Sequence, residues 1–260
     1  MSKPTVVKPL ITSNWGDQFG YPAARALLPL VTRFPLITPN KVTIVSFLLF
    51  AFGSVSLFLE YPYHLIVAAF LIVAGYVGDD LDGQLARTRG LSSEHGDYLD
   101  KTLDVLKIYI IAASLGYAVY LESLNALAIF LAFTACFFFN YRYYIKLETM
   151  FSRINADPEY LAKSSEKRAE VHADFAAKEA RAGESLKNRL EVLWIKNRMF
   201  FAVDEAEFAL IIAFFALIGR LDIALLAIAL AQVCIAFLRL YQRGSQLHSR
   251  PGELHLPLRK

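Results

Sequence analysis

The sequence predicts an all-α integral membrane protein, a bundle of six transmembrane helices with an N-terminal interfacial helix and a cytosolic helical insertion. Two observations predict this fold class. Hydrophobic residues make up 56% of the 260 residues, and the mean hydropathy is +0.40, which is higher than soluble domains of this length show. The hydrophobic residues also gather in long runs, as membrane-spanning helices require. The net charge of +3 is too small to indicate a nucleic-acid partner, and none is expected.

Six apolar segments are each predicted to cross the membrane. They are residues 42–59, 64–86, 99–121, 124–141, 207–219 and 221–241. About 20 helical residues are needed to cross the hydrocarbon core. The fifth segment is therefore short, unless it extends backward through residues 198–206.

The charges of the connecting segments predict the orientation. Lys and Arg residues precede the first span, lie between spans two and three and between spans four and five, and follow the sixth span. The other three connections are nearly free of charge. Because Lys and Arg are enriched on the cytoplasmic side, we expect a multi-pass protein of the inner or plasma membrane. Both termini and the connection between spans two and three should face the cytoplasm.

Two segments are expected to lie outside the membrane. Residues 21–34 carry an apolar stripe suited to a helix in the headgroup layer, within a cytosolic region 1–41. Spans one to four then occupy 42–145. Residues 146–198 are rich in charge and predict one or two cytosolic helices, which form a solvated hairpin, a dimer contact or a cover over the active site. Spans five and six and a cytosolic tail occupy 199–260.

Aspartates gather at the end of the second apolar run and the start of the third. Asp79 and Asp82 are three residues apart, so they share one helix face. Asp97, Asp100 and Asp104 follow at i, i+3 and i+7, also on one face of the next helix. The short connection between the two helices lets these acidic faces meet.

Such a cluster needs a compensating cation, because like charges at a membrane boundary raise the free energy of the folded chain. Carboxylate oxygens favour Mg²⁺, Mn²⁺ or Ca²⁺ over Zn²⁺. Arg87 adds a fixed positive charge suited to phosphate oxygens, and Gly83 and Ala86 allow a ligand to approach closely. These features together predict a site for a diphosphate.

At these residues the chain resembles the CDP-alcohol phosphotransferases (CDP-alcohol phosphatidyltransferases), a family of integral membrane enzymes. Their signature reads D-x2-D-G-x2-A-R-x8-G-x3-D-x3-D, and residues 79–104 match it without a gap. The matching residues are Asp79, Asp82, Gly83, Ala86, Arg87, Gly96, Asp100 and Asp104. The stretch "TPNKVT", residues 38–43, is similar to the family's lead into the first span.

The resemblance implies a role for each of these residues. Asp79, Asp82 and Asp100 are expected to bind two Mg²⁺ or Mn²⁺ ions. Asp104 is expected to act as the general base and as a further ligand. The CDP moiety is expected at Asn40, Thr43, Gly83, Ala86, Arg87, Ser93 and Gly96.

The implied reaction transfers a phosphoalcohol group from a CDP-alcohol to an acceptor hydroxyl in phospholipid biosynthesis, which forms a phosphodiester and releases CMP. CDP-diacylglycerol with a polar, inositol-type acceptor is favoured, because residues 200–219 resemble members that handle inositol phosphate. A CDP-linked headgroup with a lipid acceptor is the alternative, and in either case at least one substrate is a lipid. Arg142 and Lys146 could bind a phosphorylated acceptor. Asp204, Glu205 and Glu207 could contact a polyol or cap a helix.

Two other functions would also place carboxylates in a membrane. A Mg²⁺-dependent intramembrane prenyltransferase needs two acidic motifs far apart in sequence, whereas here both lie within residues 79–104. A cation transporter does not require Gly83, Ala86 and Arg87 at their spacing. Release of CMP would distinguish the phosphotransferase from both. A homodimer is compatible with the sequence, but no feature requires one.

Overall fold

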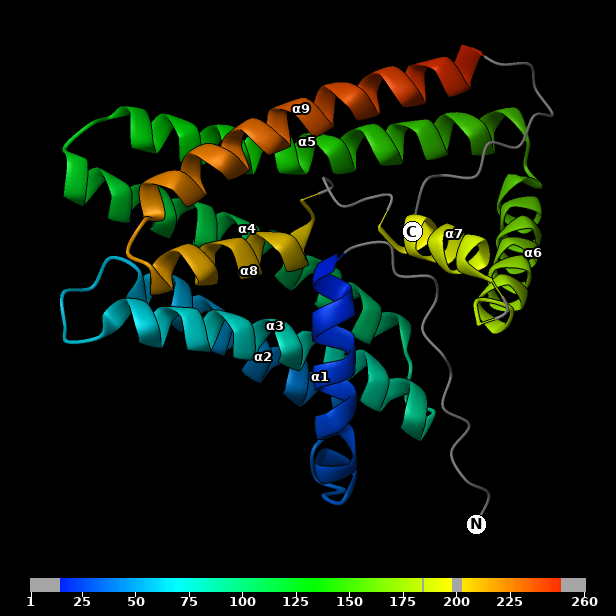
Figure 1. Cartoon of the computed structure of the whole chain (residues 1–260), viewed down its shortest axis with the longest axis horizontal. Coiled ribbons are helices and arrows are strands. Elements are labelled where there is room, and N and C mark those ends of the chain that lie inside the picture. Colours follow the sequence, from blue (N-terminus) through cyan, green and yellow to red (C-terminus); the bar gives the residue numbers. More distant parts are fainter. Residues whose placement is uncertain (1–14, 184, 198–202, 249–260) are drawn as a thin grey trace.

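The computed structural model describes residues 15–183, 185–197 and 203–248, and within these ranges it contains helices and no strand (Figure 1). The prediction of an all-α fold is confirmed. The helices are α1 (Trp15–Thr32), α2 (Pro39–Ser56), α3 (His64–Arg89), α4 (Glu94–Ser123), α5 (Leu127–Ala156), α6 (Tyr160–Ala180), α7 (Leu186–Asn197), α8 (Glu205–Leu217) and α9 (Leu221–His248). The first and last stretches of the predicted cytosolic tails, 1–14 and 249–260, lie outside the described residues.

Five helices in the described part of the chain are long and apolar enough to cross a membrane. They are α2, α3, α4, α5 and residues Leu221–Ser245 of α9. The predicted fifth span corresponds to α8, which is highly apolar but has only 13 residues. At ~1.5 Å per residue such a helix is ~20 Å long, which is less than the ~30 Å hydrocarbon core. The membrane-protein class is therefore supported, while the predicted fifth span, and with it the total of six, is not confirmed. Residues 198–202, through which it could extend, are not described.

The spanning helices run alongside one another and alternate in direction (Figure 1). The connections 57–63, 124–126 and 218–220 lie together at one end of the bundle, on the left in Figure 1. The opposite end gathers the starts of α2, α4 and α8 and the C-terminal end of α3. The aspartate signature lies at this second end.

Glycines allow α2 and α3 to pack closely. A Cβ atom on Gly75 would lie 2.7 Å from the backbone nitrogen of Phe50, and one on Gly53 would lie 2.7 Å from that of Ile72. Both separations are too short for a real side chain, so the two backbones are nearly in contact. This packing sets the first turn of α2 beside the last turns of α3.

Helix α1 lies across the direction of the spans at the signature end (Figure 1). It begins at Trp15, six residues before the predicted start, and Pro22 and Pro29 lie inside it. A Cβ on Gly16 would lie 2.5 Å from Cβ of Ala206 in α8. The Gly16 amide donates to Oε1 of Glu207 at 2.9 Å. Helix α1 is therefore fixed against the start of α8.

Arg89, the last residue of α3, joins that helix to the segment after α1. Its guanidinium donates to the carbonyl oxygens of Val31 at 3.3 Å, Thr32 at 3.2 Å and Phe34 at 3.0 Å, and also to that of Ile37. Carbonyls at a helix C-terminus have no hydrogen-bond donor within the helix. The guanidinium of Arg89 supplies these donors and a positive charge, and so stabilises the end of α1.

The charged segment after α5 forms α6 and α7, which pack on each other beyond the C-terminal end of α5 (Figure 1). Phe175 and Val192 are buried there. Leu186 and Leu190 of α7 remain exposed. The division of the chain into functional regions stays a prediction.

Candidate active site

The turn between α3 and α4 is built by local capping. Gly90 takes up a left-handed conformation (φ 65°), and the amide of Leu91 donates to the carbonyl of Ala86 at 2.9 Å, which ends α3. Ser93 then caps α4, where its hydroxyl accepts from the amide of Gly96 at 3.1 Å. The connection is only a few residues long, so the acidic end of α3 and the acidic start of α4 lie side by side.

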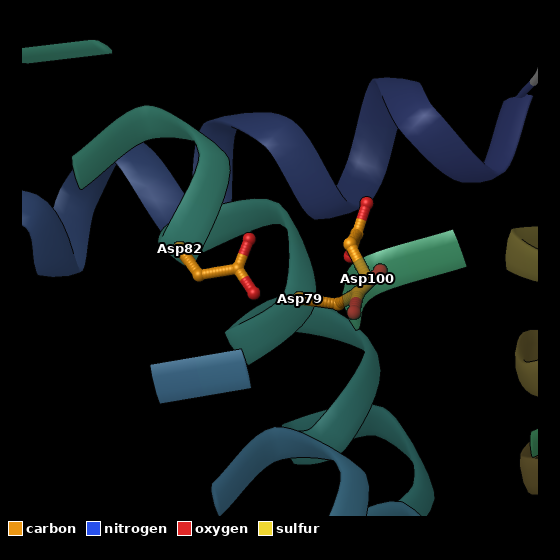
Figure 2. Close-up of side chains that lie close together, drawn as sticks. All are labelled: Asp79, Asp82 and Asp100. Carbon is orange, nitrogen blue, oxygen red and sulfur yellow. The ribbon is translucent and has the colours of Figure 1, made fainter. Parts of the chain in front are cut away.

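Three of the predicted aspartates meet at this turn. One carboxylate oxygen from each of Asp79, Asp82 and Asp100 lies within 4.8 Å of the others. Figure 2 shows Asp79 and Asp82 on α3 and Asp100 on α4, with the three carboxylates close together. The structure thus brings together the three residues that the sequence predicts as metal ligands, which we call the three-aspartate cluster.

The chemistry of this cluster fits a divalent cation. Asp82 is only 7% exposed, and its buried Oδ2 has no hydrogen-bond partner among the described residues. A buried carboxylate oxygen without a partner is costly, and a bound cation would remove that cost. The donors are oxygens only, which suits Mg²⁺ or Mn²⁺ better than Zn²⁺.

A second group of carboxylates lies next to the first and shares Asp79 with it. One oxygen each from Asp79, Asp104 and Glu205 lies within 4.8 Å of the others. The ammonium of Lys107 is among them, 2.5 Å from Oδ1 of Asp79, 2.8 Å from Oδ1 of Asp104 and 3.4 Å from Oε1 of Glu205. Lys107 is only 2% exposed, so this group is held together by a buried cation of the chain itself.

Sequence reasoning assigned no role to Lys107. Its position three residues after Asp104, inside an apolar run, was the available signal, because an ionisable residue within a membrane helix usually has a function. Glu205 was considered only as a polyol contact or a helix cap. It comes from α8, and only the packing of α8 beside α3 brings it to the site.

The residues predicted to bind CDP form two groups. On α3, a Cβ at Gly83 would lie 3.2 Å and 3.4 Å from the two terminal nitrogens of Arg87, so that the guanidinium lies over the bare glycine. Ala86 is half-buried one residue before Arg87. Arg87 itself is exposed, so its charge is accessible to an anionic ligand.

The second group lies where α2 and α4 begin. A Cβ on Gly96 would lie 3.2 Å from Oγ of Ser93 and 3.4 Å from Oδ1 of Asn40. Thr43 is buried one turn further along α2, and its hydroxyl donates to the carbonyl of Pro39 at 3.1 Å. Asn40, Ser93 and Gly96 are thus brought together by the fold.

The predicted acceptor cations lie on α5 and make contacts within the protein. Arg142 is buried and donates to the carbonyl of Val203 at 3.0 Å and to Oε1 of Gln232 at 2.8 Å. It also pairs with Asp204, the N-cap of α8. The ammonium of Lys146 lies 5.6 Å from the ring centre of Tyr143. Arg142 therefore joins α5, α8 and α9 beside Glu205.

Two further aspartates of the signature region, Asp80 and Asp97, lie outside the three-aspartate cluster. The carboxylate of Asp80 lies against Gly20 of α1, where a Cβ would overlap it. Asp97 pairs with Lys101 on the exposed side of α4. Both occupy variable positions of the signature.

A sequence model of the CDP-alcohol phosphatidyltransferase family matches residues 36–167, about half of the chain. The chain belongs to this family. The matched region contains the three-aspartate cluster, Asp104 and the residues of both groups predicted to bind CDP. The resemblance inferred from the signature is confirmed.

Two relatives are similar to parts of this CDP-alcohol phosphatidyltransferase family member. An uncharacterized protein of Aquifex aeolicus is 36% identical over 119 residues, which are 44% of this chain and 59% of that protein. An archaetidylinositol phosphate synthase of Pyrococcus horikoshii is 40% identical over 70 residues, which are 27% of this chain and 36% of the synthase. The chain thus matches between about a third and three fifths of the length of these relatives.

Proposed function

We propose that this membrane protein transfers a phosphoalcohol group from a CDP-alcohol to an acceptor hydroxyl and releases CMP, as a step of phospholipid biosynthesis. The observation that carries the proposal is the three-aspartate cluster, in which the buried Oδ2 of Asp82 has no hydrogen-bond partner within the described part of the chain. Membership of the family supports the reaction class.

The residues around the cluster suit a CDP-linked substrate. Asp79, Asp82 and Asp100 would hold the divalent cation, which would neutralise the diphosphate and the charge that develops on it. The guanidinium of Arg87 would bind phosphate oxygens. Asn40 and Gly96 would border the nucleotide, where the absence of a side chain at Gly96 leaves room for it.

Asp104 would accept the proton of the acceptor hydroxyl. The oxygen of that hydroxyl then forms a bond to the phosphorus that carries the donor's alcohol, and the bond from this phosphorus to the bridging oxygen of CMP breaks. The acceptor's O–H bond and one P–O bond of the diphosphate are cleaved, one new P–O bond forms, and the products are a phosphodiester and CMP. Positioning of the two reacting groups in line would provide much of the rate enhancement.

For the substrates we propose CDP-diacylglycerol as the donor and an inositol-phosphate-type polyol as the acceptor. The archaetidylinositol phosphate synthase of P. horikoshii and the likeness of residues 200–219 to members that handle inositol phosphate support this choice. Arg142 and Lys146 remain the proposed cations for an acceptor phosphate. Arg142 would then have to share its donors with Asp204 and Gln232.

The site and both termini are proposed to face the cytoplasm, because the bundle end that holds the aspartates is also the end where the positively charged connections lie. The expectation of two metal ions stays a prediction from the family resemblance. A homodimer is likewise neither required nor tested.

The substrate assignment is tested by incubating the purified protein with Mg²⁺, several CDP-alcohols and several acceptors, followed by mass spectrometry of the lipid extract. We expect a lipid phosphodiester from a CDP-lipid and inositol phosphate. A product formed only from a CDP-linked headgroup and diacylglycerol would support the alternative donor. Formation of a lipid product without release of CMP would contradict the proposed reaction.

A further inference from the structure

Lys107 is a deeply buried charged side chain beside the candidate active site. It lies in the middle of α4 and is 2% exposed. A lysine within a membrane helix usually extends its ammonium toward the headgroups. Here the ammonium is directed instead at the carboxylates of Asp79, Asp104 and Glu205.

The ammonium of Lys107 has as many N–H donors as there are carboxylates around it. A lysine ammonium has three N–H donors, and three carboxylates lie within 3.4 Å of it. Both aspartates meet the ammonium with Oδ1. Lys107 therefore fixes one oxygen of each carboxylate and leaves the other oxygen for the three-aspartate cluster or the substrate.

Glu205 is the partner that comes from another helix. It is the first residue of α8, and its neighbours in sequence are also fixed: Asp204 pairs with Arg142 of α5, and Glu207 accepts from the amide of Gly16 in α1. Glu205 is thus held in place from both sides. Its negative charge offsets part of the positive charge that Lys107 brings to the site.

We propose that Lys107 and Glu205 are positioning residues that orient Asp79 and Asp104 and, through their opposite charges, set the affinity of the three-aspartate cluster for its divalent cation. This proposal rests on the proposed function only in that the cluster binds such a cation. Lys107 repels a cation held by Asp79, whereas Glu205 reduces that repulsion. The pair keeps the carboxylates ordered without making the site so negative that the ion cannot be exchanged.

The test measures Mn²⁺ affinity of the full-length protein in detergent, by isothermal titration and by the electron paramagnetic resonance of free Mn²⁺. Lys107→Met should tighten binding by about tenfold or more, since removal of one positive charge a few ångströms from a divalent ion has this effect even at high dielectric constant. Glu205→Gln should weaken binding several-fold. The double variant should return to within about threefold of wild type.

Lys101→Met is the matched control, because Lys101 lies on the same helix, is 68% exposed and pairs with Asp97 outside the cluster. Its Mn²⁺ affinity should equal that of wild type. A role in folding alone would lower the melting temperature of both Lys107→Met and Glu205→Gln and would not shift their affinities in opposite directions. If Lys107→Met does not fold, Glu205→Gln and the double variant carry the test.

The outcomes separate the two proposals. Mn²⁺ binding in wild type with equal affinity in all three variants, or with shifts in the same direction, overturns the role of Lys107 and Glu205 and leaves the proposed function intact. Failure of the wild-type protein to bind Mn²⁺ overturns the metal site itself, and with it both proposals. As a further check, turnover of Glu205→Gln should show a lower kcat with little change in KM for the CDP-alcohol.

Discussion

The ammonium of Lys107 lies 2.8 Å from Oδ1 of Asp104 and 2.5 Å from Oδ1 of Asp79, so one side chain of α4 connects the proposed base with a proposed metal ligand on α3. This contact fixes the relative position of two carboxylates that come from different helices.

Asp104→Asn should abolish turnover and leave CDP binding measurable. The amide cannot accept the acceptor's proton, but its oxygen can still receive the hydrogen bond from Lys107. The loss in kcat should be about a thousandfold or more, at the upper part of the range for general bases. Turnover is measured by release of CMP and binding by equilibrium titration with CDP in the presence of Mg²⁺. Equal loss of both would mean that Asp104 is a metal ligand and not the base.

Asp82→Asn should raise the stability of the metal-free protein and abolish its stabilisation by Mg²⁺. In the absence of metal the variant should melt about 2–4 °C higher than wild type, the shift that ~1 kcal/mol produces in a chain of this size. The reason is that the substitution removes the charge of a buried carboxylate whose Oδ2 has no hydrogen-bond partner among the described residues. Added Mg²⁺ should stabilise wild type and not the variant. Thermal unfolding with and without Mg²⁺ checks both effects. The exposed Asp97, paired with Lys101, supplies the control Asp97→Asn, and a metal response lost in this control as well would contradict the assignment.

Gly83→Ala should weaken CDP binding by about tenfold and leave Mn²⁺ affinity unchanged. The added methyl would lie 3.2 Å from a terminal nitrogen of Arg87, so the flexible guanidinium must shift away from its position above the helix. A charge-assisted hydrogen bond to phosphate is worth about 1.5–3 kcal/mol, and a partial loss gives the expected decrease. The control is Gly244→Ala in α9, where the methyl has open space. An unchanged CDP affinity in Gly83→Ala would remove Arg87 from the site.

Arg89→Ala should loosen the segment that joins α1 and α2. The side chain donates to four backbone carbonyls between Val31 and Ile37, and the loss should cost about 1–3 kcal/mol. Hydrogen exchange of residues 31–41 should become faster, while that of α5 and α9 stays the same. Because Asn40 lies only three residues after Ile37, KM for the CDP-alcohol should rise. Exchange rates equal to those of wild type in this segment would show that Arg89 does not hold it.

The sequence was sufficient to predict the three-aspartate cluster because its geometry is local. The three-residue spacing from Asp79 to Asp82 sets one helix face, and the short turn after Gly90 brings Asp100 beside it. The spacing of residues in the sequence could not place Glu205 at the site, because its position depends on how α8 packs against α3. The role of Lys107 was missed because the helical phase of α4 was considered only for its aspartates.

The membrane topology was predictable to a similar extent. Long apolar runs define α2 to α5 and α9, whereas α8 combines strong hydrophobicity with only 13 residues, so composition alone suggests a span that length does not confirm. The interfacial helix was predicted from its apolar stripe to begin at Tyr21, whereas α1 begins at Trp15, so that Pro22 lies inside the helix. A proline is also tolerated further inside when neighbouring packing holds the helix, as the contacts of Gly16 and Gly20 do here.

The most direct test of the central claim is the release of CMP from a CDP-linked lipid by the purified protein, with and without Mg²⁺. We predict release that requires both Mg²⁺ and an acceptor alcohol, and that is lost in Asp82→Asn and in Asp104→Asn while Asp97→Asn retains it. Release of CMP that is independent of metal, or equal in Asp82→Asn and wild type, would contradict the assignment of the three-aspartate cluster as the catalytic centre.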